Sequence, residues 1–146
     1  MNKDEILKLG RQALEENIEK FDFVKSDMKQ NHQVHYGEVL GILNNYKHDI
    51  SFGWIDKPNQ FVMEIHIWWN TKMKPHISQV EREKYARVVF ERVKRDINRN
   101  YDDTSRGNYR GKTCKALIRF NDDEIDPKFL KELCRGTIES IIDSNG

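Results

Sequence analysis

The sequence of 146 residues predicts a single α+β domain, residues 1–146, with elements in the order α-β-β-β-α-β-α. Apolar residues recur every three or four positions in some stretches, as in helices, and every two positions in others, as in strands. No linker, repeat or low-complexity block divides the chain, and Leu, Ile, Val and Phe make up about a quarter of it. We expect a mostly antiparallel four-stranded sheet with the helices packed on one face.

Residues 3–20 predict an amphipathic helix. Asn2 and Glu5 have the spacing of a capping box, which satisfies free N–H groups where a helix begins. The apolar positions of this stretch fall on one helical face: Ile6, Leu9, Ala13, Leu14 and Ile18.

Three stretches with apolar residues two apart predict a meander of antiparallel strands. Turn-forming residues at 44–45 and 56–59 separate them. Gly37 and Gly41 predict a bulge or a close contact in the first strand. The three stretches are residues 34–42, 50–54 and 61–69.

The longest predicted helix begins at Ser78, which forms a second capping box with Glu81, and extends to about Asn100. Its buried face is Tyr85, Ala86, Val89, Val93 and Ile97. A long flexible polar loop is expected at 101–112.

A fourth strand is predicted at 114–120 and a last helix after Asp126, which caps it, with Pro127 at the first helical position. Cys114 and Cys134 lie on the apolar faces of these two elements, without the spacing of a zinc site or of a disulfide framework. Both are therefore expected to be buried thiols.

The order of elements resembles that of the type III secretion chaperones and their relatives, which also set a short antiparallel sheet against flanking helices. Those proteins act as homodimers. The resemblance is one of element order, and no functional residue is carried over from it.

Charge is balanced overall but not locally. The chain has 25 Lys and Arg against 24 Asp and Glu, a formal net charge of +1. Residues 82–115 hold 11 basic and 5 acidic residues, which leaves the rest of the chain acidic. Basic residues spaced by three or four in the long helix predict a stripe away from its apolar face, and the stripe continues into the loop. Its members are Lys84, Arg92, Arg95, Arg99, Arg106, Tyr109 and Arg110.

This stripe predicts a binding surface for an acidic macromolecule, and a protein partner is the first expectation. RNA or single-stranded DNA is the alternative, with Tyr109 stacking on a base. A third interpretation is a solvated face neutralised by its own pairs, Glu83 with Arg87 and Glu91 with Arg95.

The third strand predicts a second surface. If its odd-numbered residues face the helices, Val62, Glu64, His66 and Trp68 lie on the opposite face of the sheet. Val62 and Trp68 could then mediate a homodimer, since exposed Trp is a common interface anchor. The alternative is that another segment of the same chain covers Trp68 and leaves Glu64 and His66 as a surface pair.

Catalytic motifs are weak. Asp56 followed by Glu64-Ile65-His66 resembles a Mg²⁺-dependent nuclease pattern, but His66 takes the place of the lysine. No phosphate-loop, dinucleotide or hydrolase-elbow motif occurs, and His48 and His76 are expected in surface loops. We expect no cofactor and no metal site.

Membrane insertion and secretion are not expected either. No apolar stretch approaches the roughly 20 residues that span a bilayer, and residues 1–23 lack the apolar block of a signal peptide. The sequence thus favours a non-enzymatic cytoplasmic interaction module of the chaperone, inhibitor or adaptor kind.

Overall fold

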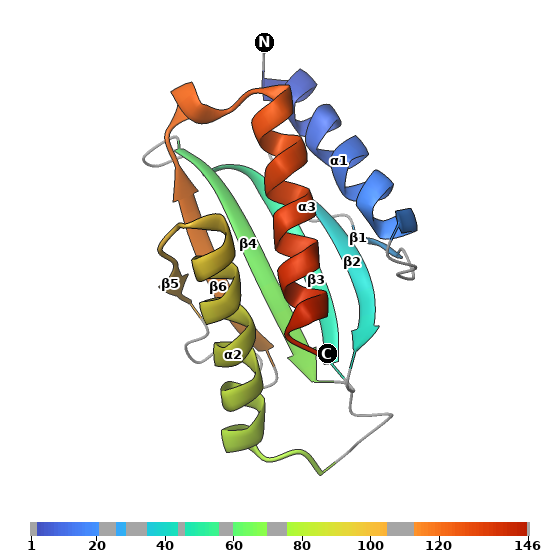
Figure 1. The fold of residues 1–146 in the computed structure, drawn as a ribbon, viewed down its shortest axis with the longest axis vertical. Helices are drawn as coiled ribbons and strands as arrows, with labels where there is room; N and C mark the ends of the chain where they lie inside the picture. Colours follow the sequence, from blue (N-terminus) through green and yellow to red (C-terminus); the bar gives the residue numbers. More distant parts are fainter. Residues whose placement is uncertain are drawn as a thin grey trace.

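The computed structural model describes residues 3–20, 26–28, 35–43, 46–55, 60–69, 76–104 and 113–145. Within them the chain forms three α-helices, one short 3₁₀ turn and one antiparallel sheet (Figure 1). The helices are α1 (Lys3–Lys20), α2 (Gln79–Ile97) and α3 (Pro127–Asp143), and the 3₁₀ turn is η2 (Asp122–Glu124). The strands are β1 (Ser26–Met28), β2 (His35–Leu43), β3 (Tyr46–Ile55), β4 (Gln60–Trp69), β5 (Asp102–Asp103) and β6 (Thr113–Phe120).

The sheet has the strand order β1-β2-β3-β4-β6-β5, and every neighbouring pair is antiparallel. Its four long strands, β2, β3, β4 and β6, are the four that the sequence predicts. Two short edge strands extend it. One of them, β5, lies at the start of the predicted loop, where Asp102 and Asp103 pair with Leu117 and Ala116. The remainder of that loop, 105–112, lies outside the described residues.

The predicted irregularity in β2 is present, since the register with β3 shifts between Val39 and Gly41. The third predicted strand, 61–69, matches β4 to within one residue. The second, predicted at 50–54, is longer, because β3 begins at Tyr46 and ends at Ile55. The four additional residues at its start include His48 and Asp49, which become important for both faces of the sheet.

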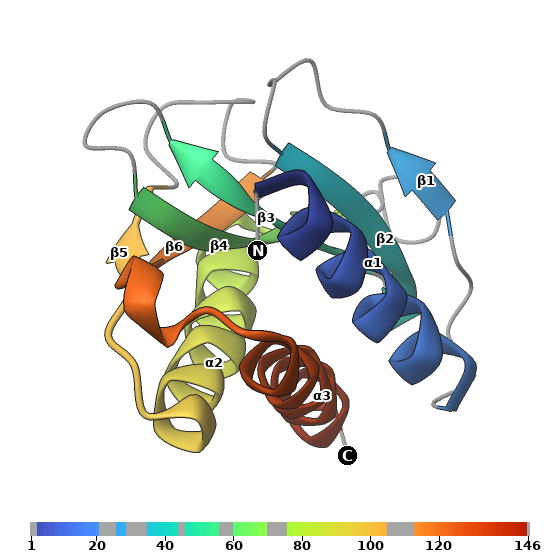
Figure 2. The same cartoon turned by 90° about the horizontal axis from the view of Figure 1, so that it is seen from above.

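All three helices cover one face of the sheet, as predicted (Figure 2). Helix α3 lies between α1 and α2 and contacts both of them. Helix α1 also contacts β2 and β3, whereas α2 contacts β6. The face of the sheet away from the helices is called the second face below.

The ends of α2 and α3 follow from their capping residues. The hydroxyl of Ser78 accepts the N–H of Glu81 at 3.1 Å, and the carboxylate of Asp126 accepts the N–H of Phe129 at 2.8 Å. Helix α2 ends at Asn98, which adopts the left-handed conformation (φ 55°) and donates its N–H to the carbonyl of Lys94.

The core lies between the sheet and the helices. Phe61 is fully buried at its centre, and its ring meets those of Trp54 at 5.0 Å and Phe120 at 5.8 Å. Both cysteines are buried free thiols, as predicted, and burial raises the pKa of Cys134 to about 12. The largest side chains buried there are Phe52, Phe61, Phe120, Leu14, Ile50, Met63, Ile65, Ile67, Ile118, Leu130 and Ile138.

Helix α1 approaches the sheet closely at Gly10. A Cβ atom at this position would overlap the ring of Phe52 on β3, so the contact needs a residue without a side chain. The thiol of Cys134 on α3 lies 3.9 Å from the carbonyl oxygen of the same glycine. Gly10 therefore allows α1 to pack closely against β3. None of the described helices combines the length and the apolar character needed to cross a bilayer.

Candidate functional site

The solvent-facing side of α2 carries the first candidate surface, called the α2 ridge here: Val80, Lys84, Arg87, Val88 and Arg95. Val80 is 75% exposed and Val88 is 51% exposed. They are the exposed large hydrophobic residues within the described part of the chain. The three basic residues are also exposed. Residues at these spacings share one side of a helix, so the valines and the cations form a continuous surface.

The ion pairs that would neutralise this surface are not those expected from spacing. Glu83 accepts a hydrogen bond from Gln79 at 3.0 Å, and Glu91 accepts the hydroxyl of Tyr101 at 2.9 Å. Arg95 pairs with the adjacent Asp96 at 3.0 Å. Within the described residues, Lys84 and Arg87 have no ion-pair partner, so the positive charge of the N-terminal half of the ridge faces solvent.

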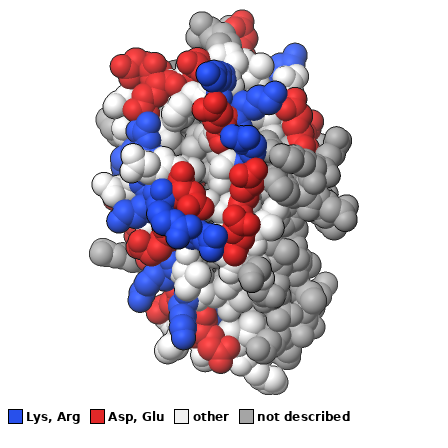
Figure 3. Space-filling view, viewed as in Figure 1, with Lys and Arg blue, Asp and Glu red and all other residues white. Residues whose placement is uncertain are grey.

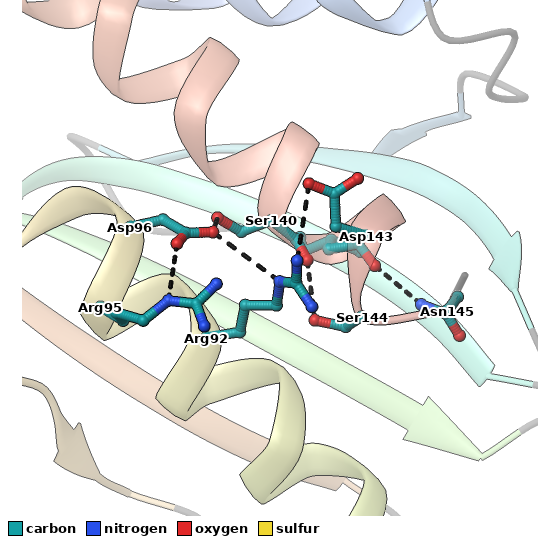
Figure 4. Close-up of polar contacts among 8 residues, drawn as sticks. Arg92, Arg95, Asp96, Ser140, Asp143, Ser144 and Asn145 are labelled. Atoms are coloured by element: carbon teal, nitrogen blue, oxygen red, sulfur yellow. Dashed lines mark hydrogen bonds and ion pairs between the residues drawn. The ribbon is translucent and has the colours of Figure 1, made fainter.

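The predicted basic stripe is divided by the packing of α2 against its neighbours. Lys84 and Arg95 belong to the α2 ridge, but Arg92 turns toward α3, where it lies 3.8 Å from Asp143 (Figure 4). It also lies 3.9 Å from Asp96 of its own helix. Arg99 turns toward η2. These two arginines therefore connect elements of the same chain. Arg106, Tyr109 and Arg110, the loop members of the stripe, lie outside the described residues.

Arg99 joins the end of α2 to η2 and to the aromatic core. Its Nη1 and Nη2 atoms each lie 2.9 Å from a carboxylate oxygen of Glu124, which is a bidentate ion pair. The guanidinium carbon lies 5.2 Å from the ring centre of Phe120 and 5.8 Å from that of Phe129. A cation held on two sides in this way has a structural role.

Asp96 joins α2 to α3. Its carboxylate accepts the hydroxyl of Ser140 at 2.6 Å and the Nε–H of Arg95 at 3.0 Å (Figure 4). The hydrogen bond from Ser140, followed by the contacts with Arg95 and Arg92, lowers the pKa of Asp96. The carboxylate thus remains ionised next to α3.

A groove of about 410 Å³ lies beside this contact, between the C-terminal half of α2, the end of β6 and α3. We call it the α2–α3 groove. Its apolar lining is Ile97, Phe120, Phe129, Leu133 and Gly136. Its charged lining is Asp96, Arg99, Glu132, Arg135, Glu139 and Asp143, in which acids outnumber bases by four to two.

The second face of the sheet is the other candidate site, and it is more enclosed than predicted. Val62 is fully buried, so of the two residues expected at a self-association surface only Trp68 keeps partial exposure. His66 is 6% exposed, so it is not half of an open surface pair. Its Nε2 lies 2.8 Å from a carboxylate oxygen of Glu64.

A second carboxylate faces the same imidazole. Strand register places Asp49 opposite His66, and the Nδ1 of His66 lies 3.8 Å from Oδ2 of Asp49. Asp49 is 1% exposed, and neither of its carboxylate oxygens accepts a hydrogen bond. Burial, then the charge of Glu64, raises the pKa of Asp49 to about 6, although His66 and Lys115 act in the opposite direction. Asp49, His66 and Glu64 together are called the second-face triad below.

This arrangement does not support the Mg²⁺-dependent nuclease interpretation of Asp56, Glu64 and His66. Asp56 lies outside the described residues, and the carboxylate that approaches Glu64 and His66 is Asp49 instead. Within the described ranges, no three His, Cys, Asp or Glu side chains are placed to hold a metal ion. Asp49 was not among the residues predicted for this site, because the strand expected from the sequence began at Ile50. Alternation continued back to Tyr46 would have placed Asp49 on the second face.

His48 is also placed differently from the prediction of a surface loop. It lies in β3 on the helix side and is fully buried. Its Nε2 lies 2.7 Å from the hydroxyl of Tyr85, which donates to Oδ1 of Asn145 at 3.0 Å. Burial raises the pKa of Tyr85 to about 12. These contacts tie β3, α2 and the chain after α3 together, so His48 is part of the fold.

Comparisons with known proteins find no matching family model, no similar curated protein and no similar solved structure.

Proposed function

We propose that the chain is a non-enzymatic interaction module whose α2 ridge binds an acidic surface on a partner protein. The observation that carries this proposal is the exposure of Val80 and Val88 among basic side chains on one side of α2. Exposed apolar side chains that stand alone are ordinary features of a surface. Two on one helical face, with cations beside them, provide both an apolar contact and a charge that selects the partner.

The energetics favour a protein as the partner. Full burial of a valine side chain stabilises a complex by about 1.5 to 3 kcal/mol before the entropic cost of association. The cations Lys84 and Arg87 contribute mainly by steering and by excluding partners of like charge. Nucleic acid remains the alternative, and Glu91 between the ridge cations opposes phosphate and protein carboxylates alike, so the exposed valines decide between the two partners. The valines gain nothing from phosphate contacts.

The test is the capture of an acidic partner by the purified, immobilised protein from lysate of its own source cells. We compare wild type with the variant Lys84→Glu/Arg87→Glu. Because like charges across an interface cost several kcal/mol, capture should fall by about ten-fold or more. A matched control, Lys8→Glu/Lys47→Glu, makes the same charge change at exposed positions of α1 and β3.

Undiminished capture by the ridge variant would overturn the proposal, as would equal loss in the control. The same proteins are then titrated with a labelled single-stranded oligonucleotide. Oligonucleotide binding that weakens with salt and is absent in the ridge variant would indicate that the ridge binds nucleic acid.

A further inference from the structure

One face of the molecule carries both a basic surface and an acidic one. In Figure 3 a group of basic side chains lies over α2, and a column of acidic side chains lies beside it along the C-terminal half of α3, whereas the N-terminal half of α3 carries further basic side chains. The basic surface is the α2 ridge, and the acidic one borders the α2–α3 groove. They are neighbours because the groove begins where the buried side of α2 meets α3.

The two surfaces have opposite charge. The ridge presents Lys84, Arg87 and Arg95 to solvent. The groove has four acids and two bases. Arg99 is neutralised by its bidentate contact with Glu124, Asp96 by Arg95 and Asp143 by Arg92. The groove charges that remain are two acids, Glu132 and Glu139, and one base, Arg135. Glu132 and Glu139 on α3 have no ion-pair partner within the described part of the chain. The uncompensated charge of the groove is therefore negative.

Their shapes are complementary as well. The ridge projects two exposed valines. The groove is a hollow of about 410 Å³ whose apolar lining comes from Ile97, Phe120, Phe129 and Leu133. That volume lies within the range of about 300 to 1,000 Å³ over which proteins enclose apolar ligand groups. A ridge with apolar side chains flanked by cations fits a groove with an apolar lining bordered by carboxylates.

We propose that the occupant of the α2–α3 groove is the α2 ridge of a second copy of this chain, so that two copies form a closed dimer. A two-fold axis lying in the plane between the two copies would place each ridge over the groove of its partner, and both contacts would form twice. This inference rests on the proposed function, because it names the partner of the α2 ridge. It replaces the second face of the sheet as the expected dimer surface.

The test uses sedimentation velocity over a range of protein concentrations. The ridge variant is Lys84→Glu/Arg87→Glu and the groove variant is Glu132→Lys/Glu139→Lys. Each should weaken dimerisation by about ten-fold or more, because like charges then meet in both copies of the contact. The control Lys8→Glu/Lys47→Glu should dimerise as wild type does, because both positions lie outside the ridge and the groove. Circular dichroism verifies that every variant is folded.

The decisive sample is an equimolar mixture of the ridge variant and the groove variant. In the mixed dimer the reversed ridge meets the reversed groove, and the native ridge meets the native groove. Both contacts are therefore attractive again, and dimerisation should recover to within about three-fold of wild type.

Three results would overturn the inference: a wild-type protein that stays monomeric, dimers that persist in both variants, or a mixture that does not recover. Failure here is distinguishable from failure of the proposed function. If the ridge binds a different protein, the ridge variant should lose that binding and the groove variant should keep it. If the proposed function is wrong, neither variant should change the binding of any protein.

Discussion

The α2 ridge and the second-face triad place charged groups in opposite environments. Lys84 and Arg87 on α2 are solvated, so their charges cost the folded state little and remain available to a partner. Asp49 is enclosed and accepts no hydrogen bond, so its ionised form depends on the imidazole of His66. Charge on the ridge is therefore available to the partner that we propose, whereas charge in the triad makes the stability of the fold depend on pH.

The largest effect should come from removing the imidazole. His66→Ala takes away the imidazole that lies between the carboxylates of Asp49 and Glu64, and it leaves a hole in a buried row of the sheet. We expect the free energy of unfolding in urea at pH 7 to fall by about 3 kcal/mol. His76→Ala, at an exposed position, should change it by less than about 0.5 kcal/mol. Equal effects of the two substitutions would contradict the buried placement of His66.

The next effect concerns the pH dependence that Asp49 introduces. Its pKa is raised from 3.8 to about 6 in the folded state, so the folded chain holds this proton more tightly than the unfolded chain does. The contribution of Asp49 is therefore most favourable below about pH 4, and it is lost as the pH rises toward and through 6.

Asp49→Asn stays neutral and should remove this dependence. Relative to wild type, the variant should gain stability between pH 4 and pH 7, on the order of 2 to 3 kcal/mol from a shift of about two pKa units. Urea unfolding at a series of pH values measures it. Asp123→Asn, an exposed acid on η2, is the control and should follow wild type. A constant difference between Asp49→Asn and wild type would show that the carboxyl is not perturbed.

The smallest effect on stability is expected for substitutions in the α2 ridge. Lys84→Ala and Arg87→Ala remove solvated charges without an ion-pair partner in the described chain, so each should change the free energy of unfolding by less than about 0.5 kcal/mol. Thermal or urea unfolding measures this. A decrease of more than about 1 kcal/mol in the free energy of unfolding would mean that these side chains stabilise the fold. That result would contradict the proposal that they form a binding surface.

Local pattern predicted the elements well because their causes are local. Ser78 and Asp126 cap helices by bonding N–H groups three residues ahead, and alternation in β4 correctly divided its two faces. The same reasoning failed at β3. Its first four residues include polar and charged side chains, which local pattern assigns to a turn, yet they pair with β4 through Trp69, Trp68, Ile67 and His66.

Only part of the basic surface of α2 could be predicted from the sequence. The sequence placed Lys84 and Arg95 away from the apolar side of α2, because helical period alone determines that side. It also placed Arg92 and Arg99 in the same stripe, but these residues lie near the boundary where α3 and η2 pack against α2. Their acidic partners, Asp143 and Glu124, come from elements far along the chain, so spacing carries no sign of the contacts.

By itself, the sequence determined the α+β class, the order of the helices and long strands, the helix caps and which side of each element is apolar, because each depends on residues within a few positions of one another. Only the tertiary structure decided that Val62 is buried, that Asp49 faces His66, and that a groove opens beside the α2 ridge. Those features depend on strand register and on helix packing, which bring together residues that no local spacing relates.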